Sequence, residues 1–311
     1  MKILLTGGSS FTGLWFARAL KEAGHEVLAP LRGSADAYSE GVRAQRVQEL
    51  QRVAQIEWNM SFGDDKFLDL TKTTSFDIFC HHAAQVGDYK SLNFDIPGAL
   101  QANTRALSLV LENLRIGGIK RTVLTGSVFE NDEGAGNAPL QAFSPYGLSK
   151  GLTWTTFKFW CEKLDIQLRK FVIPNPFGPF EEPRFCAYLM RTWAKGEAAA
   201  VQTPDYIRDN IHVDLLALAY GRFVTEESGN FANQKLNPSG YIESQGAFAL
   251  RFAKEISGRL QLPCNVELLR QQDFAEPAIR INFDDASRYT DSWKESQSWD
   301  ELAEYYRGVY L

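Results

Sequence analysis

The sequence is poor in the residues that mark disulfide-rich, zinc-binding and membrane-spanning proteins. Its only cysteines are Cys80, Cys161, Cys186 and Cys264, and no two of them form a C-x-x-C pair. Their spacing argues against a zinc ribbon or a disulfide framework and favours free thiols in a reducing compartment. No apolar run approaches a membrane span, and the start "MKILLTGG" has no signal-peptide pattern. We therefore expect a cytoplasmic protein.

An excess of basic charge is also missing. Lys and Arg number 33 against 38 Asp and Glu, which gives a formal net charge of −5. No global basic field favours nucleic acid or an anionic membrane, so neither is expected as a partner. Apolar residues make up 44% and charged residues 23% of the 311 residues, which is typical of a globular protein with one large domain or two linked ones.

Strand-length apolar segments alternate with helix-length amphipathic segments in the first 175 residues. This alternation is typical of β-α-β units with a parallel sheet. The regularity weakens after Asn175, where a Pro-rich loop begins. We predict an α/β fold: a Rossmann-type doubly wound parallel sheet with a smaller, interleaved C-terminal lobe. The expected strands cover 2–6, 25–31, 56–58, 76–84, 121–127 and 167–175, and the expected helices cover 10–23, 39–54, 98–116 and 146–164.

A glycine-rich loop, "TGGSSFTG" at 6–13, lies between the first expected strand and the first expected helix. Glycines allow a tight turn and close backbone approach, and a helix N-terminus offers free N–H groups to a pyrophosphate. This context predicts a dinucleotide-binding loop. The residues expected to contact the cofactor there are Thr6, Gly7, Ser10, Phe11 and Gly13.

The stretch "SPYGLSK" at 144–150 joins a helix start to a tyrosine and a lysine. Ser144 is a good N-cap and Pro145 a good first-turn residue. Tyr146 and Lys150 are four residues apart, so they share one face of the helix. An ammonium near a phenol lowers the phenol's pKa, which suits a tyrosine that exchanges protons with a hydroxyl or a carbonyl.

Five stretches together resemble the extended short-chain dehydrogenases/reductases, and within them the NAD-dependent epimerase/dehydratase family that modifies sugar nucleotides. The resemblance is strong from 1 to 215 and loose after 235. It implies a dinucleotide-binding domain of 1–175 with 205–233 returning to it, and a substrate-binding lobe of 176–204 and 234–311. The stretches are "TGGSSFTG", "DIFCHHAAQ", "VLTGSVFE", "SPYGLSK" and "RDNIHVDLLALAY".

For the cofactor, the resemblance implies that Ala83 and Ala84 let it lie against the end of the fourth strand. Lys150 is expected to contact it as well. Ser10 stands where the family usually has its second glycine. The second strand ends "VLAPLRG", with Arg32 and no acidic residue. An arginine there suits the 2′-phosphate, so NADP is expected ahead of NAD; the alternative is a solvated surface arginine.

For catalysis, the resemblance puts Thr125 in the position that hydrogen-bonds the substrate oxygen, with Ser127 as the reserve candidate. Tyr146 and Lys150 complete the catalytic set. Family members that dehydrate usually have Asp-Glu after this threonine, whereas Gly126 and Ser127 stand here, so redox chemistry alone is expected.

For substrate binding, the resemblance implies Asn175, Arg208 and Arg280, the arginines for a diphosphate. For each arginine, a plain exposed side chain is the alternative. No metal site is expected, because the adjacent His81 and His82 would point to opposite faces of a strand.

These features together predict an enzyme that transfers a hydride. The first hypothesis is an NADP-dependent oxidoreductase that reduces a 4-keto group of a nucleotide-linked sugar. The alternatives are an NAD-dependent 4-epimerase and, in another class, a non-catalytic NADP-sensing or RNA-binding relative. The 146–164 helix has a second apolar side, Leu148, Leu152, Thr155 and Phe159, so we expect a homodimer through this helix.

Overall fold

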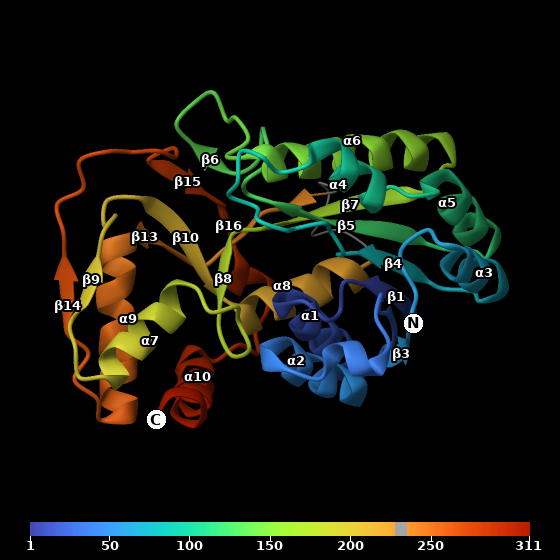
Figure 1. Cartoon of the computed structure of the whole chain (residues 1–311). Helices are drawn as coiled ribbons and strands as arrows, with labels where there is room; N and C mark the ends of the chain where they lie inside the picture. The colour runs from blue at the N-terminus through green and yellow to red at the C-terminus, as the bar shows by residue number, and fades with distance from the viewer. Residues whose placement is uncertain (228–234) are drawn as a thin grey trace.

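A computed structural model describes residues 1–227 and 235–311 of the chain. A large twisted sheet with helices on both faces forms one end of the molecule, and a smaller lobe forms the other (Figure 1). The sheet has seven parallel strands in the order β11-β7-β5-β4-β1-β2-β3. They are β1 (Lys2–Thr6), β2 (Glu26–Pro30), β3 (Gln55–Glu57), β4 (Ile78–His81), β5 (Arg121–Ser127), β7 (Gln167–Ile173) and β11 (Lys235–Leu236).

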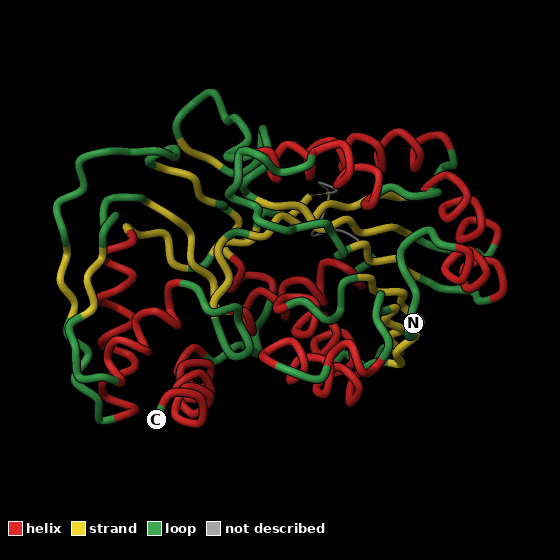
Figure 2. Tube along the Cα trace, viewed as in Figure 1, coloured by secondary structure: helices red, strands yellow, loops and turns green. Residues whose placement is uncertain are grey.

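Helices cover both faces of this sheet, as the red coils on either side of the yellow strands show (Figure 2). On one face lie α1 (Phe11–Glu22), α2 (Gly41–Val53) and α8 (Val213–Thr225). On the other lie α3 (Asp65–Thr73), α4 (Ile96–Asn103), α5 (Leu107–Ile116) and α6 (Pro145–Lys163). Strand residues alternate between the two cores, as Val123 and Leu124 of β5 do. This arrangement confirms the predicted doubly wound, Rossmann-type sheet.

The smaller lobe has its own core around Phe177, Trp193, Phe252 and Trp299. Its sheet follows the order β13-β10-β15-β6, with β8 paired to β10. Its elements are β6 (Ala135–Gly136), β8 (Asn175–Phe177), β9 (Ala199–Val201), β10 (Ile207–His212), β12 (Pro238–Ser239), β13 (Tyr241–Ser244), β14 (Val266–Leu268), β15 (Ile279–Ile281), β16 (Asp284–Asp285), α7 (Phe185–Ala194), α9 (Gln245–Leu260) and α10 (Glu295–Tyr310).

The segment 205–233, expected to return to the sheet domain, divides between the two cores. Strand β10 pairs with strands of the smaller sheet, whereas α8 packs on α1. Residues 228–233 of this segment, and residue 234 of the next, lie outside the described residues. Strand β11, expected in the lobe, pairs with β7 of the large sheet.

Two expected elements are each divided in the structure. The helix expected at 98–116 is two helices, α4 and α5, separated at Ala106, whose φ is +49°. At the end of α4 the buried Asn103 accepts a hydrogen bond from Gln85 N at 2.8 Å and donates to Thr153 Oγ1 at 3.3 Å, which fixes the break. The strand expected at 167–175 ends at 173, because Pro174 has no N–H for the sheet.

In the described part of the chain, no helix is long and apolar enough to cross a membrane.

Candidate active site

The predicted cofactor and catalytic residues meet at the C-terminal ends of β1, β4 and β5. At this edge of a parallel sheet, loops and helix N-termini converge, and ligands bind in such folds. Helices α1 and α6 both begin here, capped by Ser10 and Ser144, whose hydroxyls accept hydrogen bonds from Gly13 N and Gly147 N. The fold therefore brings the glycine loop and the Tyr-Lys pair together.

The glycine loop requires glycine at both of its predicted positions. Gly7 has a φ of +80°, and a Cβ there would lie 2.7 Å from Ala83 N. A Cβ on Gly13 would overlap the Gly7 carbonyl oxygen. Thr6 Oγ1 accepts a hydrogen bond from Ala83 N at 3.1 Å, which ties the loop to the end of β4. The loop therefore presents bare backbone at a helix N-terminus, as a pyrophosphate site needs.

Ser10, which replaces the family's usual glycine, turns its hydroxyl inward. Its Oγ donates to Gly7 O at 2.8 Å and accepts from Gly13 N at 3.1 Å. The same oxygen lies 2.9 Å from Nε2 of His82, which is also 3.1 Å from Thr12 Oγ1. Burial lowers the pKa of His82 to about 3, so the ring is neutral. His82, which the sequence did not single out as a cofactor-loop residue, therefore supports the loop through Ser10 and Thr12.

Two exposed arginines bear on the choice of cofactor, and one of them contacts the glycine loop. Arg32 is exposed directly after Leu31, which is 2% exposed and stands where NAD-binding folds often place an acid. Arg43 of α2, which sequence analysis missed, donates from Nη2 to Ser9 Oγ at 2.9 Å and lies over the Tyr38 ring. Arg43 lies in the first turn of α2, 30 residues after Gly13 in the sequence, and no motif marks it.

Lys150 of α6 reaches the end of β5, whereas Tyr146, one turn earlier in the helix, is partly buried against the loop before α4. Lys150 is 4% exposed and donates from Nζ to the Thr125 carbonyl oxygen at 2.6 Å. Burial lowers the pKa of Lys150 to about 8, and the Glu130 carboxylate opposes that shift. Burial and Glu130 together raise the pKa of the Tyr146 phenol above its usual range. Burial thus outweighs the lowering of the tyrosine pKa that the sequence led us to expect.

The two candidate hydroxyls of β5 differ in environment. Thr125 contributes its carbonyl to Lys150, but its hydroxyl is buried on the α8 face of the sheet, near Tyr220. Ser127, at the strand end, is partly exposed, and its Oγ accepts from Phe129 N at 3.2 Å. Of the two, the Ser127 hydroxyl is the more accessible to a ligand.

An aromatic wall next to Tyr146 was not found from the sequence. The rings of Tyr89 and Phe94, in the loop before α4, meet the Tyr146 ring edge-on at centroid distances of 6.1 and 5.9 Å. Phe129 stacks on Tyr89, and the guanidinium of the exposed Arg184 lies over the Tyr89 ring, 5.0 Å from its centroid. Isolated aromatics in a loop give no pattern in a sequence, so only the fold shows this wall.

The three predicted substrate residues are not equally available. Asn175 lies in β8, opposite Asn210 of β10. Arg208 donates to the carbonyls of Ile207, Pro277 and Ala278 and pairs with Glu276 at 3.0 Å. Arg280, which is 1% exposed, donates to the backbone carbonyls of Glu130, Glu133 and Gln141. Both arginines brace the lobe in this structure, and neither is a plain exposed side chain.

In the described residues, no three His, Cys, Asp or Glu side chains are placed to hold a metal ion. His81 lies 3.1 Å from Thr6 Oγ1 through Nδ1 and stacks on Phe157, and burial lowers its pKa to about 3. His81, at the end of β4, and His82, directly after it, are therefore both neutral, and each contacts a hydroxyl group of the protein.

Solved structures with this fold cover the whole chain. UDP-glucose 4-epimerase from Thermotoga maritima aligns over 100% of both chains, with 18% identity and a TM-score of 0.74. UDP-glucuronic acid 4-epimerase from Bacillus cereus, solved with UDP-glucuronic acid and NAD, also covers 100% of both chains, at 17% identity and a TM-score of 0.74. DesIV from Streptomyces venezuelae, a dTDP-glucose 4,6-dehydratase solved with NAD, aligns over 99% of this chain and 97% of its own, at 15% identity and a TM-score of 0.71. No curated protein matches the sequence significantly.

The doubly wound sheet, the glycine loop and the nearby Tyr146 and Lys150 are those expected of the extended short-chain dehydrogenases/reductases that the sequence resembles. The model of the NAD dependent epimerase/dehydratase family matches residues 3–237, and the chain belongs to that family. This confirms the resemblance found in the sequence and the expectation of an NAD(P)-dependent enzyme of the oxidoreductase/epimerase type.

Proposed function

We propose that the chain transfers a hydride at C4 of a nucleotide-linked sugar and epimerises the sugar at that carbon. The observation that carries the proposal is the placement of the buried Lys150 and the partly buried Tyr146 near the glycine loop, at the end of β5. Solved structures of the same fold include UDP-glucose and UDP-glucuronic acid 4-epimerases, which supports the sugar-nucleotide class. Gly126 and Ser127 provide no acid-base pair for loss of water, which supports redox chemistry alone.

The residues at the sheet edge fit a dinucleotide cofactor. Gly7 and Gly13 keep side chains away from the loop, and the α1 N-terminus follows it directly. Thr6, Phe11, Ala83 and Ala84 complete the surface that we expect to hold the cofactor, with Lys150 beneath it. When bound, the nicotinamide supplies the hydride acceptor and donor for the sugar carbon.

Tyr146 is the residue we assign to proton transfer. In epimerisation it would act as a base toward the C4 hydroxyl as the hydride leaves that carbon, and as an acid toward the keto oxygen as the hydride returns. Burial raises the pKa of the phenol and so favours the protonated form that the second step needs. Lys150 fixes the strand end through the Thr125 carbonyl and places an ammonium near the reaction. Ser127, with Thr125 in reserve, is assigned to hydrogen-bond the sugar oxygen.

Arg184 is more available to the substrate diphosphate than Arg208 or Arg280. It is exposed, lies 5.0 Å over Tyr89 and is close enough to Tyr146 to lower the pKa of that phenol. Arg208 and Arg280 already donate to backbone carbonyls, so a direct role for them requires that those bonds be exchanged. We assign the diphosphate to Arg184 first and Asn175 to contact with the sugar.

A second candidate is NADP-dependent reduction of a 4-keto sugar nucleotide. Leu31 replaces the acid that would bind the ribose 2′-hydroxyl, and the exposed Arg32 and Arg43 suit a 2′-phosphate. A reductase consumes NADPH, whereas an epimerase returns the hydride it removes, so the cofactor preference separates the two candidates.

We also propose that the chain forms a homodimer through α6. Leu148, Leu152 and Phe159 of this helix are 40%, 38% and 52% exposed, a row of apolar side chains on the side away from the sheet. Covering that row requires a partner surface. Light scattering at micromolar concentration should give twice the 35.0 kDa chain mass. A monomer would contradict the dimer.

The function is tested by binding and then by turnover. A ligand that binds only the folded state raises its apparent thermal stability. We expect NAD or NADP to raise the melting temperature, and a UDP- or dTDP-hexose to raise it further in the presence of cofactor. Turnover is then followed at 340 nm for net reduction and by NMR for inversion at C4. Binding of neither cofactor would contradict both candidates.

A further inference from the structure

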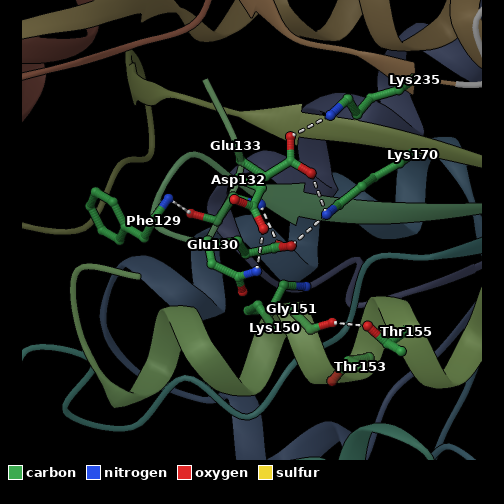
Figure 3. Close-up of polar contacts among 12 residues, drawn as sticks. Phe129, Glu130, Asp132, Glu133, Lys150, Gly151, Thr153, Thr155, Lys170 and Lys235 are labelled. Atoms are coloured by element: carbon green, nitrogen blue, oxygen red, sulfur yellow. Dashed lines mark hydrogen bonds and ion pairs between the residues drawn. The ribbon is translucent and has the colours of Figure 1, made fainter. Parts of the chain in front are cut away.

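A cluster of charged side chains lies buried beneath the proposed site, between α6 and the sheet (Figure 3). Lys170 of β7 donates from Nζ to Glu130 Oε2 and to Glu133 Oε1, both at 2.6 Å. Glu130, Lys170 and Glu133 are 0%, 2% and 4% exposed. Lys235 reaches the outer oxygen of Glu133 at 3.0 Å. Two carboxylates and two ammonium groups therefore form one chain of ion pairs.

Burial of these ions is costly for stability. Moving each ion out of water costs several kcal/mol, and an apolar group of similar size often does as well or better. Hydrogen bonds to the inner groups reduce the cost: Glu130 Oε1 accepts from Ser127 N at 2.8 Å, and Lys170 lies 5.0 Å over the Trp154 ring of α6. These two contacts also join the cluster to the strand end and to the catalytic helix.

The cluster determines the shape of the turn that follows β5. Glu130 N donates to Ser127 O at 3.0 Å, and its side chain returns to Ser127 N, so both backbone groups of Ser127 are fixed. A Cβ at Gly126 would lie 2.6 Å from Lys170 Cε and 3.1 Å from Glu130 Oε1. Lys170 therefore fills the space that a side chain at position 126 would need. The glycine in the strand end and the lysine in β7 fit each other.

The cluster also lies close to Lys150, because Lys150 Nζ donates to the Thr125 carbonyl and Glu130 Oε1 accepts from Ser127 N two residues further along β5. The charged or titratable groups that act on the Lys150 ammonium are Glu130 from the turn between β5 and β6, Lys170 from β7, His81 at the end of β4, and His82 directly after it. Both histidines are neutral at physiological pH, since burial lowers their pKa to about 3. Glu130 is therefore the negative charge opposite Lys150, and it opposes the lowering of the lysine pKa by burial.

We propose that Glu130 and Lys170 form a positioning pair for the hydride-transfer site: Glu130 fixes the turn that carries Ser127 and provides the carboxylate that faces Lys150, and Lys170 holds that carboxylate in place. This inference rests on the proposed function of Tyr146, Lys150 and Ser127. Neither Glu130 nor Lys170 is assigned a contact with substrate or cofactor. Both act through the residues that make those contacts.

Mutations of both members separate a positioning role from a purely structural one. Lys170→Met removes the ammonium that pairs with Glu130, and Glu130→Gln leaves Lys170 with Glu133 as its remaining carboxylate, so both should lower the melting temperature. The double variant Glu130→Gln/Lys170→Met should regain part of the stability lost in Lys170→Met, because position 130 then carries no charge and Glu133 keeps its pair with Lys235. Lys158→Met on the exposed face of α6 is the matched control, since Lys158 has only a 3.9 Å pair with Glu162.

The expected result is a turnover defect that stability does not explain. We expect kcat of the double variant to stay about 100-fold below that of the full-length wild-type enzyme, as displacement of a catalytic group by about 1 Å produces. KM and the Kd for the cofactor should stay within about threefold of wild type, and Lys158→Met should behave as wild type. A double variant that regains kcat along with its melting temperature would show a structural role only and overturn the proposal.

A second measurement does not depend on turnover. The lysines are labelled at 13Cε in the full-length protein and titrated by NMR, with Lys150→Met used to assign the Lys150 signal. In Glu130→Gln, Lys150 should lose its proton at a lower pH than in wild type, because Glu130 raises the pKa of Lys150. The double variant does not replace the single one here, because it also removes Lys170, which lowers the pKa of Lys150. An unchanged titration overturns the proposal. If no sugar nucleotide is turned over by wild type, the proposed function fails, while this titration still decides whether Glu130 faces Lys150.

Discussion

The arginines of the two lobes differ in what they already bind. In the sheet domain, Arg32 and Arg43 are exposed, and Arg43 donates to the hydroxyl of the buried Ser9 in the glycine loop. In the lobe, Arg208 and Arg280 are buried and donate to backbone carbonyls. A sequence motif places an arginine at the correct position in both lobes. Its availability to a phosphate depends on partners from distant segments, and these differ between the two lobes.

The largest effect should come from Arg280. Replacement by methionine leaves buried carbonyls of the 130–141 loop without a donor, at about 1–3 kcal/mol for each. We expect the free energy of unfolding to fall by about 3 kcal/mol in urea titrations, with the denaturant slope unchanged. Arg288→Met, whose side chain is 80% exposed, is the control. If Arg280→Met were as stable as wild type but had a raised KM for the sugar nucleotide, Arg280 would bind the diphosphate, and the difference between the two lobes would not hold.

Arg184 should show the opposite pattern. Its replacement by methionine removes a charged group from the proposed diphosphate site but no buried contact. We expect about a tenfold rise in the KM for the sugar nucleotide, which corresponds to about 1.4 kcal/mol. The melting temperature should remain that of wild type. If KM is unchanged and stability falls, Arg184 belongs with the structural arginines.

Arg32 and Arg43 should affect the cofactor alone. Alanine at either position should weaken NADPH binding by about five- to tenfold and NADH binding by less than twofold, because only NADPH carries the 2′-phosphate. Isothermal titration calorimetry measures both constants, with Arg52→Ala on the exposed end of α2 as the control. Equal losses for the two cofactors would remove the 2′-phosphate role and leave the epimerase with NAD.

The smallest effect should be a change in pH dependence within the lobe. Asp209 is fully buried, and burial raises its pKa to about 7 despite hydrogen bonds from Gly240 N and Asn282 N. The folded state holds this proton better than the unfolded state. The contribution of Asp209 to the free energy of unfolding is therefore full below about pH 4 and is lost as the pH rises through 7. Asp209→Asn should remove this part of the pH dependence of the free energy of unfolding. The free energy of unfolding is measured for both proteins at pH 5 and pH 8. An equal change between the two pH values in wild type and in Asp209→Asn would contradict this prediction.

The fold and the main site elements were predictable because their signals are local. The β-α alternation, the glycine loop and the Ser-Pro helix start each occupy a few consecutive residues, and their geometry follows from hydrogen bonding and backbone sterics. The break at Ala106 was not predictable, because it depends on Asn103 contacting Gln85 and Thr153 from elsewhere in the chain. The pairing of Gly126 with Lys170 was hidden for the same reason.

The sequence also did not reveal the direction in which several site side chains point. The sequence places Thr125 and Ser127 at the end of one strand, but only the packing of β5 shows that the Thr125 hydroxyl lies near Tyr220 and that Ser127 is partly exposed. Likewise, "TGGSSFTG" does not show that Ser10 turns toward His82. The pKa of Tyr146 depends on burial by Tyr89 and Phe94, which the spacing of Tyr146 and Lys150 cannot reveal.

The central claim, that Tyr146 transfers the proton in hydride exchange with a nucleotide-linked sugar, is tested most directly by Tyr146→Phe. The measurement is turnover by wild type and variant with a UDP- or dTDP-hexose and the preferred cofactor, next to the Kd for that cofactor. The account predicts that kcat falls by about 10²- to 10⁴-fold while the Kd is nearly unchanged. Turnover by Tyr146→Phe at the wild-type rate would contradict it.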